Sequence, residues 1–235
     1  MSTWFSKLFS GQDAPDPRLN ADQQRLLADW SRLPPPDLGR SHRQSRYVVV
    51  DVELGGLDTR TESLLAIGAL AVTDGLIDFN DAFRATLATD GPPPTEAEAG
   101  SDRPSAAMAP ADALIALLRF AGKAPLVVYH AVFVAKRLER ALSEHLRLDL
   151  PQPWLDLAWV MSDLFREVSE MDGRLDPWLD HFAIESIRRH DALSDAYDTA
   201  RLLQIAIAKA ARKGFDTPAS LLELEKARRH MHQDG

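Results

Sequence analysis

One short segment strongly limits what this chain can fold into, because it joins a buried strand to two carboxylates. The apolar run Tyr47-Val48-Val49-Val50 has the length and β-branched content of a buried strand, and Asp51, Val52 and Glu53 follow it directly. Side chains alternate between the two faces of a strand, so Asp51 and Glu53 point to one side and Val52 to the other. The fold must therefore contain a covered sheet, and something must compensate two neighbouring negative charges.

This segment alone leaves two interpretations of the acidic pair open. A divalent cation could hold both carboxylates, or the strand could reach the surface here and leave both to water. The chain has no cysteine, so a bound metal would need oxygen or imidazole ligands. Carboxylates favour Mg²⁺ or Mn²⁺. The net charge of -8 argues against a protein that coats duplex nucleic acid, but it allows an enzyme that acts on one nucleic-acid end.

Periodicity and turn residues predict a mixed α/β fold around the first strand. The apolar run at residues 64–72 and the segment 76–87 are joined by Asp74-Gly75, which predicts a hairpin and thus three antiparallel strands. Residues 125–130 predict a short buried strand between helices, as in mixed sheets that helices cover. Residues 91–110, rich in Pro, Gly and acidic residues, predict a long irregular loop. We expect helices at residues 20–33, 111–120, 133–146, 154–165, 175–182, 192–212 and 218–230.

The length of 235 residues suits one domain with additions at both ends. We expect an N-terminal tail, helix and Pro-rich linker at residues 1–45, a central domain at 46–213 and a helical extension at 214–235. No apolar stretch reaches the roughly 20 residues that span a bilayer. The first residues also lack a basic leader with a continuous apolar core, so we expect a cytoplasmic protein without membrane contact.

A further pair of chemically active residues lies at the start of the helix expected at residues 192–212. His190 comes just before this helix, and Asp195 lies in its first turns, where the helix dipole tolerates negative charge. Both residues have ordinary interpretations as well. Asp195 could be a surface residue that complements the dipole, and His190 could be a histidine with satisfied hydrogen bonds at the domain boundary.

Taken together, three motifs resemble those of the DEDD exonuclease superfamily, histidine subtype. They are Asp51-Val52-Glu53 followed by Gly56-Leu57-Asp58, then His130-Ala131-Val132-Phe133, and last His190-Asp191-Ala192-Leu193-Ser194-Asp195. Known members of this superfamily include the proofreading subunit of bacterial DNA polymerase III and ribonuclease T, and the resemblance covers about residues 46–203. It implies a ribonuclease H-like mixed sheet flanked by helices, here with an added N-terminal helix and an added C-terminal helix.

The resemblance also implies a function, the hydrolysis of phosphodiester bonds at nucleic-acid ends by a metal-dependent 3′ to 5′ exonuclease. The family uses two ions of Mg²⁺ or Mn²⁺. Asp51 would bridge the two ions, Glu53 and Asp195 would complete the ligands of the ion on the nucleophile side, and His190 would be the general base.

The same resemblance implies where the substrate would bind. The expected substrate contacts are Gly56, Leu57, His130 and Phe133, although Leu57 could equally be a packed surface leucine. The expected partners are single-stranded nucleic-acid 3′ ends or nucleotides. The sequence leaves open the choice between DNA and RNA, the oligomeric state, and whether a polymerase or another protein is a partner.

The chain departs from the family pattern in its second motif. The family's fourth carboxylate would follow Phe133, but Val134 stands there and cannot ligate a cation. Leu54 also replaces the usual threonine, and Asp198 or Asp156 is an alternative carboxylate that could stand in for the missing ligand. Three interpretations follow: an active or weakened exonuclease, a catalytically degenerate module that binds nucleic-acid ends or a protein, and a chance set of motifs on an unrelated α/β protein.

Overall fold

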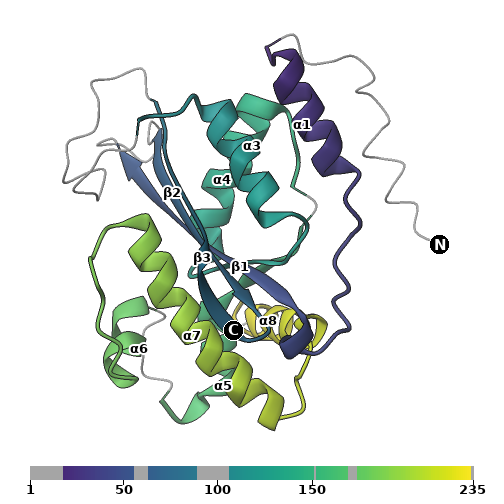
Figure 1. Cartoon of the computed structure of the whole chain (residues 1–235). Helices are drawn as coiled ribbons and strands as arrows, with labels where there is room; N and C mark the ends of the chain where they lie inside the picture. Colours follow the sequence, from purple (N-terminus) through teal and green to yellow (C-terminus); the bar gives the residue numbers. More distant parts are fainter. Residues whose placement is uncertain (1–17, 56–62, 89–105, 151, 169–173, 234–235) are drawn as a thin grey trace.

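A five-stranded mixed sheet forms the centre of the computed structural model, which describes residues 18–55, 63–88, 106–150, 152–168 and 174–233 (Figure 1). The strands lie in the order β3-β2-β1-β4-β5. The first three strands are antiparallel neighbours, whereas β4 is parallel to β1 and β5 is parallel to β4. Their bounds are β1 (Arg46–Gly55), β2 (Ser63–Thr73), β3 (Leu76–Thr86), β4 (Leu126–Val128) and β5 (Trp154–Asp156).

Helices cover both faces of the sheet, and β1 contributes to a separate core on each face. Val48, Val50 and Val52 lie in a core with α3 and α4, whereas Tyr47 and Val49 lie in a core with α5, α7 and α8. This division follows from the alternation of side chains along a strand that is buried on both faces. The helices are α1 (Ala21–Ser31), α3 (Pro110–Ala121), α4 (Ala131–Leu146), α5 (Leu157–Leu164), α6 (Leu175–His181), α7 (Ala192–Arg212) and α8 (Pro218–Gln233).

The predicted α/β architecture is confirmed, but the helix predicted at residues 154–165 begins too early. Its first three residues form β5, and α5 starts only at Leu157. The edge of β4 provides backbone partners for these residues, and this pairing overrides their local preference for helix. Most of the loop predicted at residues 91–110 lies outside the described residues.

Helices α1 and α8 pack onto the central sheet domain at opposite ends of the chain. The Trp30 side chain of α1 is buried in the core with α3 and α4, and its indole N–H donates to the Gly122 carbonyl at 2.7 Å. Leu221 and Leu224 of α8 are buried in the other core. Within the described ranges, no helix is both long enough and apolar enough to cross a membrane.

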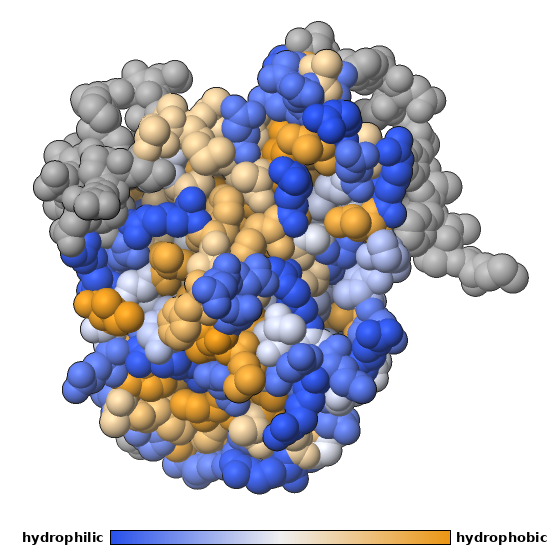
Figure 2. Space-filling model, in the orientation of Figure 1, coloured by the Kyte–Doolittle hydropathy of each residue, from blue (hydrophilic) through white to orange (hydrophobic). Residues whose placement is uncertain are grey.

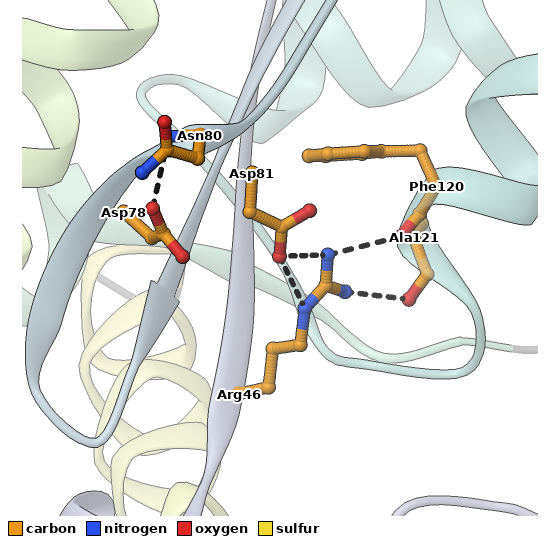
Figure 3. A network of polar contacts seen from close by, with 6 residues as sticks. All are labelled: Arg46, Asp78, Asn80, Asp81, Phe120 and Ala121. Atoms are coloured by element: carbon orange, nitrogen blue, oxygen red, sulfur yellow. Dashed lines mark hydrogen bonds and ion pairs between the residues drawn. The ribbon is translucent and has the colours of Figure 1, made fainter.

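A bulge at residues 79–81 divides β3 into two paired segments. Figure 3 shows how it is held: the Asp81 carboxylate accepts hydrogen bonds from the Arg46 guanidinium at 2.9 and 3.2 Å. Arg46 also donates to the carbonyls of Phe120 and Ala121 at the end of α3, at 3.0 and 3.2 Å. These contacts join the start of β1 to β3 and α3. Beyond the bulge, β3 pairs again with β2 beside the candidate site.

Candidate metal centre

Three carboxylates from two elements meet near the end of β1. Asp51 and Glu53 lie on the face of β1 that α7 covers, and Asp195 lies in the first turn of α7. One oxygen atom from each carboxylate lies within 4.8 Å of the other two, and all three residues are partly buried. Ligand oxygens at about 2.1 to 2.5 Å from one cation lie at similar separations from each other. The structure therefore brings these three predicted metal ligands together.

Burial raises the pKa of all three carboxyl groups, and neighbouring negative charges add to the shift at Asp51 and Glu53. Burial, together with the charges of Asp195 and Glu53, raises the pKa of Asp51 to about 8. Burial and the charges of Asp195 and Asp191 raise the pKa of Glu53 to about 7. Burial also raises the pKa of Asp195. A bound cation would favour the anionic forms of these groups and so offset the effect of burial.

The Oδ1 atom of Asp195 gives a second indication of a cation. This atom is buried, and it accepts no hydrogen bond from the described part of the chain. A buried carboxylate oxygen without a partner is costly, and a metal ion is one of the groups that satisfy it. Three carboxylates form a hard, all-oxygen set of ligands, so the residues fit Mg²⁺ or Mn²⁺.

A glycine in β2 allows α7 to approach the sheet beside Asp51. Gly68 is the β2 partner of Asp51, and a Cβ atom on it would lie only 2.3 Å from backbone atoms of Ala192 and Leu193. Any larger residue would push the start of α7, and Asp195 with it, away from the sheet. Gly68 was not among the residues predicted from the sequence, although a glycine inside an apolar strand is a signal of close backbone approach.

Asp191 caps α7 and ties it to the sheet. Its Oδ1 accepts the Ser194 N–H at 3.0 Å, and its carbonyl accepts the Asp195 N–H at 2.8 Å. Its Oδ2 accepts a hydrogen bond from the Arg84 guanidinium at 2.6 Å. Arg84 lies in β3 opposite Gly68. The sequence carried no local signal for Arg84, because 107 positions separate it from its partner.

A groove of about 460 Å³ borders α7 on the side of β3. Arg84 and Asp191 are part of its wall. The view in Figure 2 shows the face that carries α7, on which apolar residues lie among hydrophilic ones. The apolar lining consists of Leu70, Phe79, Ala82, Ile187, Leu193 and Tyr197.

His190, the predicted general base, lies at the turn that leads into α7. It is exposed and has a left-handed backbone with φ of 59°. Burial raises the pKa of Asp195, whereas the charge of His190 and a hydrogen bond from its main chain act in the opposite direction. His190 therefore lies near Asp195 and is exposed to solvent.

Two of the predicted substrate contacts lie at the start of α4. His130 is exposed in a left-handed conformation with φ of 62°, and Phe133 is 48% exposed. The Arg137 guanidinium lies 5.4 Å from the centre of the Phe133 ring. The other two predicted contacts, Gly56 and Leu57, lie outside the described residues.

Val134 lies in an apolar environment. It is 3% exposed and belongs to the core that α3 and α4 form on one face of the sheet. Leu54 is partly buried and packs against the same core. The structure thus gives both departures from the family pattern a packing role.

The two carboxylates that could have replaced the missing ligand are engaged elsewhere. Asp156 accepts the N–H groups of His130, Ala131 and Ala158 at 3.1, 2.8 and 3.1 Å, so it holds the start of α4 and of α5. Asp198 is fully buried and accepts hydrogen bonds from Ser186 and Arg201. Among the described residues, neither belongs to the cluster of three carboxylates.

The sequence profile of the RNase T family of exonucleases matches residues 48–203. The chain belongs to this exonuclease family. The resemblance to DEDD exonucleases that the three motifs indicated is therefore confirmed, and the interpretation of a chance set of motifs is wrong. A comparison with curated proteins gives no match.

Solved structures of exonucleases share the fold of this family member. Exonuclease X in complex with 5′ overhanging duplex DNA has a TM-score of 0.55 at 17% identity, over 76% of this chain and 99% of the other. The nuclease domain of 3′hExo, a DEDDh family member bound to rAMP, has a TM-score of 0.59 at 13% identity, over 76% and 97%. S. pombe Pop2p in its Mg²⁺ and Mn²⁺ bound form has a TM-score of 0.53 at 16% identity, over 79% and 88%. The predicted ribonuclease H-like fold is confirmed.

Proposed function

We propose that this chain is a metal-dependent 3′ to 5′ exonuclease that hydrolyses phosphodiester bonds at single-stranded nucleic-acid ends. The observation that carries the proposal is the cluster of Asp51, Glu53 and Asp195, in which one buried oxygen has no partner among the described residues. The family match supports the exonuclease class. Similar structures contain duplex DNA with an overhang, rAMP, or Mg²⁺ and Mn²⁺, which supports the substrate class and the metal.

In this proposal the carboxylates bind the cation and His190 moves a proton. A bound divalent cation supplies positive charge to the phosphoryl oxygens and makes water more acidic. The His190 imidazole accepts the proton of the attacking water, for which its exposure beside Asp195 is suited. Asp51, Glu53 and Asp195 remain anionic once the cation is in place.

The start of α4 is the proposed contact surface for the terminal nucleotides. The exposed Phe133 ring can stack on a nucleobase, since every base has an apolar face, and Arg137 beside it suits the phosphate backbone. His130 lies at the same helix end with its side chain exposed. Stacking of this kind does not depend on the sugar, so both DNA and RNA are candidate substrates.

The centre is proposed to hold one cation with high affinity. Val134 lies in the core of α3 and α4, and Asp156 and Asp198 are used by backbone and side-chain donors. No fourth described carboxylate belongs to the cluster with Asp51, Glu53 and Asp195. This same observation favours a second candidate function, a degenerate module that binds a metal and a nucleic-acid end without cleaving it.

A cleavage and binding experiment separates the two functions. Single-stranded DNA and RNA oligonucleotides with a 5′ label are incubated with the protein and increasing Mn²⁺, and Mn²⁺ binding is measured by calorimetry. The variants are Asp51→Ala, His190→Ala and, as a matched control, Asp29→Asn, which removes an exposed carboxylate on α1. Shortening from the 3′ end by the parent and the control, but not by Asp51→Ala, is the expected result. His190→Ala is expected to bind Mn²⁺ normally and to cleave at least 100-fold more slowly.

Other outcomes would change the assignment. If the parent binds Mn²⁺ and oligonucleotide without cleavage, and Val134→Asp cleaves, the parent is a degenerate module. A circular dichroism spectrum must show that Val134→Asp is folded, because a charge in this core is costly. If the folded parent binds no Mn²⁺, both functions are wrong.

A further inference from the structure

We propose that Arg84 and Asp191 are positioning residues that hold Asp195 in the metal centre. This inference rests on the proposed function, because it concerns the binding of the cation. Neither residue is a member of the carboxylate cluster. They act through the first turn of α7, which links the sheet to Asp195.

The Asp191 carboxylate connects the sheet to the helix through its two oxygens. Oδ2 accepts the 2.6 Å hydrogen bond from Arg84 on β3, and Oδ1 accepts the 3.0 Å hydrogen bond from the Ser194 N–H. The carbonyl of the same residue accepts the Asp195 N–H at 2.8 Å. A shift of this cap relative to β3 therefore moves the Asp195 backbone, and its carboxylate moves too.

The apolar residues of α7 pack against the sheet, but at the start of the helix the sheet offers no interlocking side chain. At the point of closest approach the sheet presents Gly68, which has no side chain that could interlock with the helix. Gly68 lies between Asp51 on β1 and Arg84 on β3 in the pairing of the strands. Gly68 permits the close approach of α7. The ion pair between Arg84 and Asp191, on the side of β3, determines the position of the start of α7 along the sheet.

The ion pair is sheltered enough to serve as a fixed attachment. The Arg84 side chain is 28% exposed and that of Asp191 only 7%. Charged hydrogen bonds between such partly buried groups are short and directional, and the rigid guanidinium fork keeps its orientation better than an ammonium group does. Contacts that orient metal ligands typically change metal affinity by 10- to 100-fold.

A purely electrostatic role of Arg84 would change the affinity for Mn²⁺ in the opposite direction. If Arg84 acted only as a positive charge near the centre, its removal would reduce repulsion and tighten the binding of a cation. If it positions Asp195, its removal weakens binding. The direction of the change in Mn²⁺ affinity therefore distinguishes the two roles.

The test is a double-mutant cycle on Mn²⁺ affinity, measured by calorimetry on the full chain without substrate. Arg84→Met and Asp191→Asn are each expected to weaken Mn²⁺ binding by about tenfold. The asparagine can still cap α7, so Asp191→Asn removes the ion pair and the negative charge that also acts on Glu53, whereas Arg84→Met removes the ion pair and keeps that charge. Because both residues act through one contact, the double variant is expected to bind no more weakly than the weaker single variant. Arg84→Lys, which keeps the charge, is expected to lose less affinity than Arg84→Met.

Arg46→Met is the matched control, because Arg46 also bonds a carboxylate on β3 but lies on the side of α3. Thermal unfolding is measured for every variant. We expect Arg46→Met to lower the midpoint of unfolding and to leave Mn²⁺ affinity within twofold of the parent. Unchanged or tighter Mn²⁺ binding by Arg84→Met, independent effects in the double variant, or an equal loss of affinity in Arg46→Met would overturn the inference. Absence of Mn²⁺ binding by the folded parent would instead overturn the proposed function and this inference together.

Discussion

Replacement of Asp51 by asparagine is expected to stabilise the metal-free protein at alkaline pH, although it removes a metal ligand. Burial and the charges of Asp195 and Glu53 raise the pKa of Asp51 to about 8, whereas an aspartate in an unfolded chain has a pKa of about 4. The folded state therefore binds this proton more tightly than the unfolded state. The stabilisation from the protonated form is complete below about pH 4 and is lost as the pH rises to about 8.

The size of the effect follows from the difference in pKa. About four pKa units correspond to about 5 kcal/mol at 1.36 kcal/mol per unit. This is an upper limit, because Asp51 is partly exposed and the three carboxyls titrate together. We expect Asp51→Asn to raise the free energy of unfolding by about 2 kcal/mol at pH 8 and by less than about 0.5 kcal/mol at pH 4.

Urea denaturation in EDTA at pH 4, 6 and 8 measures this difference. Asp29→Asn is the control, because it removes an exposed carboxylate on α1 and is expected to show little dependence on pH. Addition of Mn²⁺ at pH 8 is expected to stabilise the parent but not Asp51→Asn, so the advantage of the variant should shrink or reverse. The reasoning is refuted if Asp51→Asn in EDTA is no more stable than the parent at pH 8, or if its advantage is the same at pH 4.

Three further substitutions test the surroundings of the site. Gly68→Ala is expected to cost about 2 kcal/mol or more in urea denaturation and to weaken Mn²⁺ binding in calorimetry, because the new Cβ would collide with the backbone of α7; unchanged values would contradict the close approach. Asp156→Ala is expected to cost about 3 kcal/mol in the same assay, since three N–H groups lose their acceptor, and to leave Mn²⁺ affinity unchanged. A large loss of affinity would make Asp156 a ligand. Trp30→Phe is expected to cost about 1 kcal/mol through the hydrogen bond to Gly122, and a neutral result in urea denaturation would show that this bond does not anchor α1.

Sequence patterns that span only a few residues were sufficient to predict most of the fold. The β-branched apolar run of β1, the turn at Asp74-Gly75 and the apolar periodicity of α7 are local signals, and each predicted its element. The strand β5 was missed because only its neighbour β4 makes residues 154–156 extended. These three residues have no pattern of their own that separates them from the helix that follows.

The sequence by itself determined that Asp51 and Glu53 share one side of a strand, because the alternation of side chains is a property of the backbone. It also determined that Asp195 lies in the first turn of a helix. Only the tertiary structure decided that these carboxylates meet, since this depends on the pairing of Gly68 with Asp51 and on its close approach to α7. The contact of Arg84 with the cap of α7 spans 107 positions and is likewise invisible to local patterns.

The tertiary structure also decided the roles of Val134, Asp156 and Asp198, which the second motif had left open. Val134 packs in the core with α3 and α4. Asp156 and Asp198 accept hydrogen bonds from donors in other segments. The physical reason is the same for all three residues. Burial and hydrogen bonding depend on which segments come into contact, and local sequence patterns do not show contacts between segments that are far apart in the sequence.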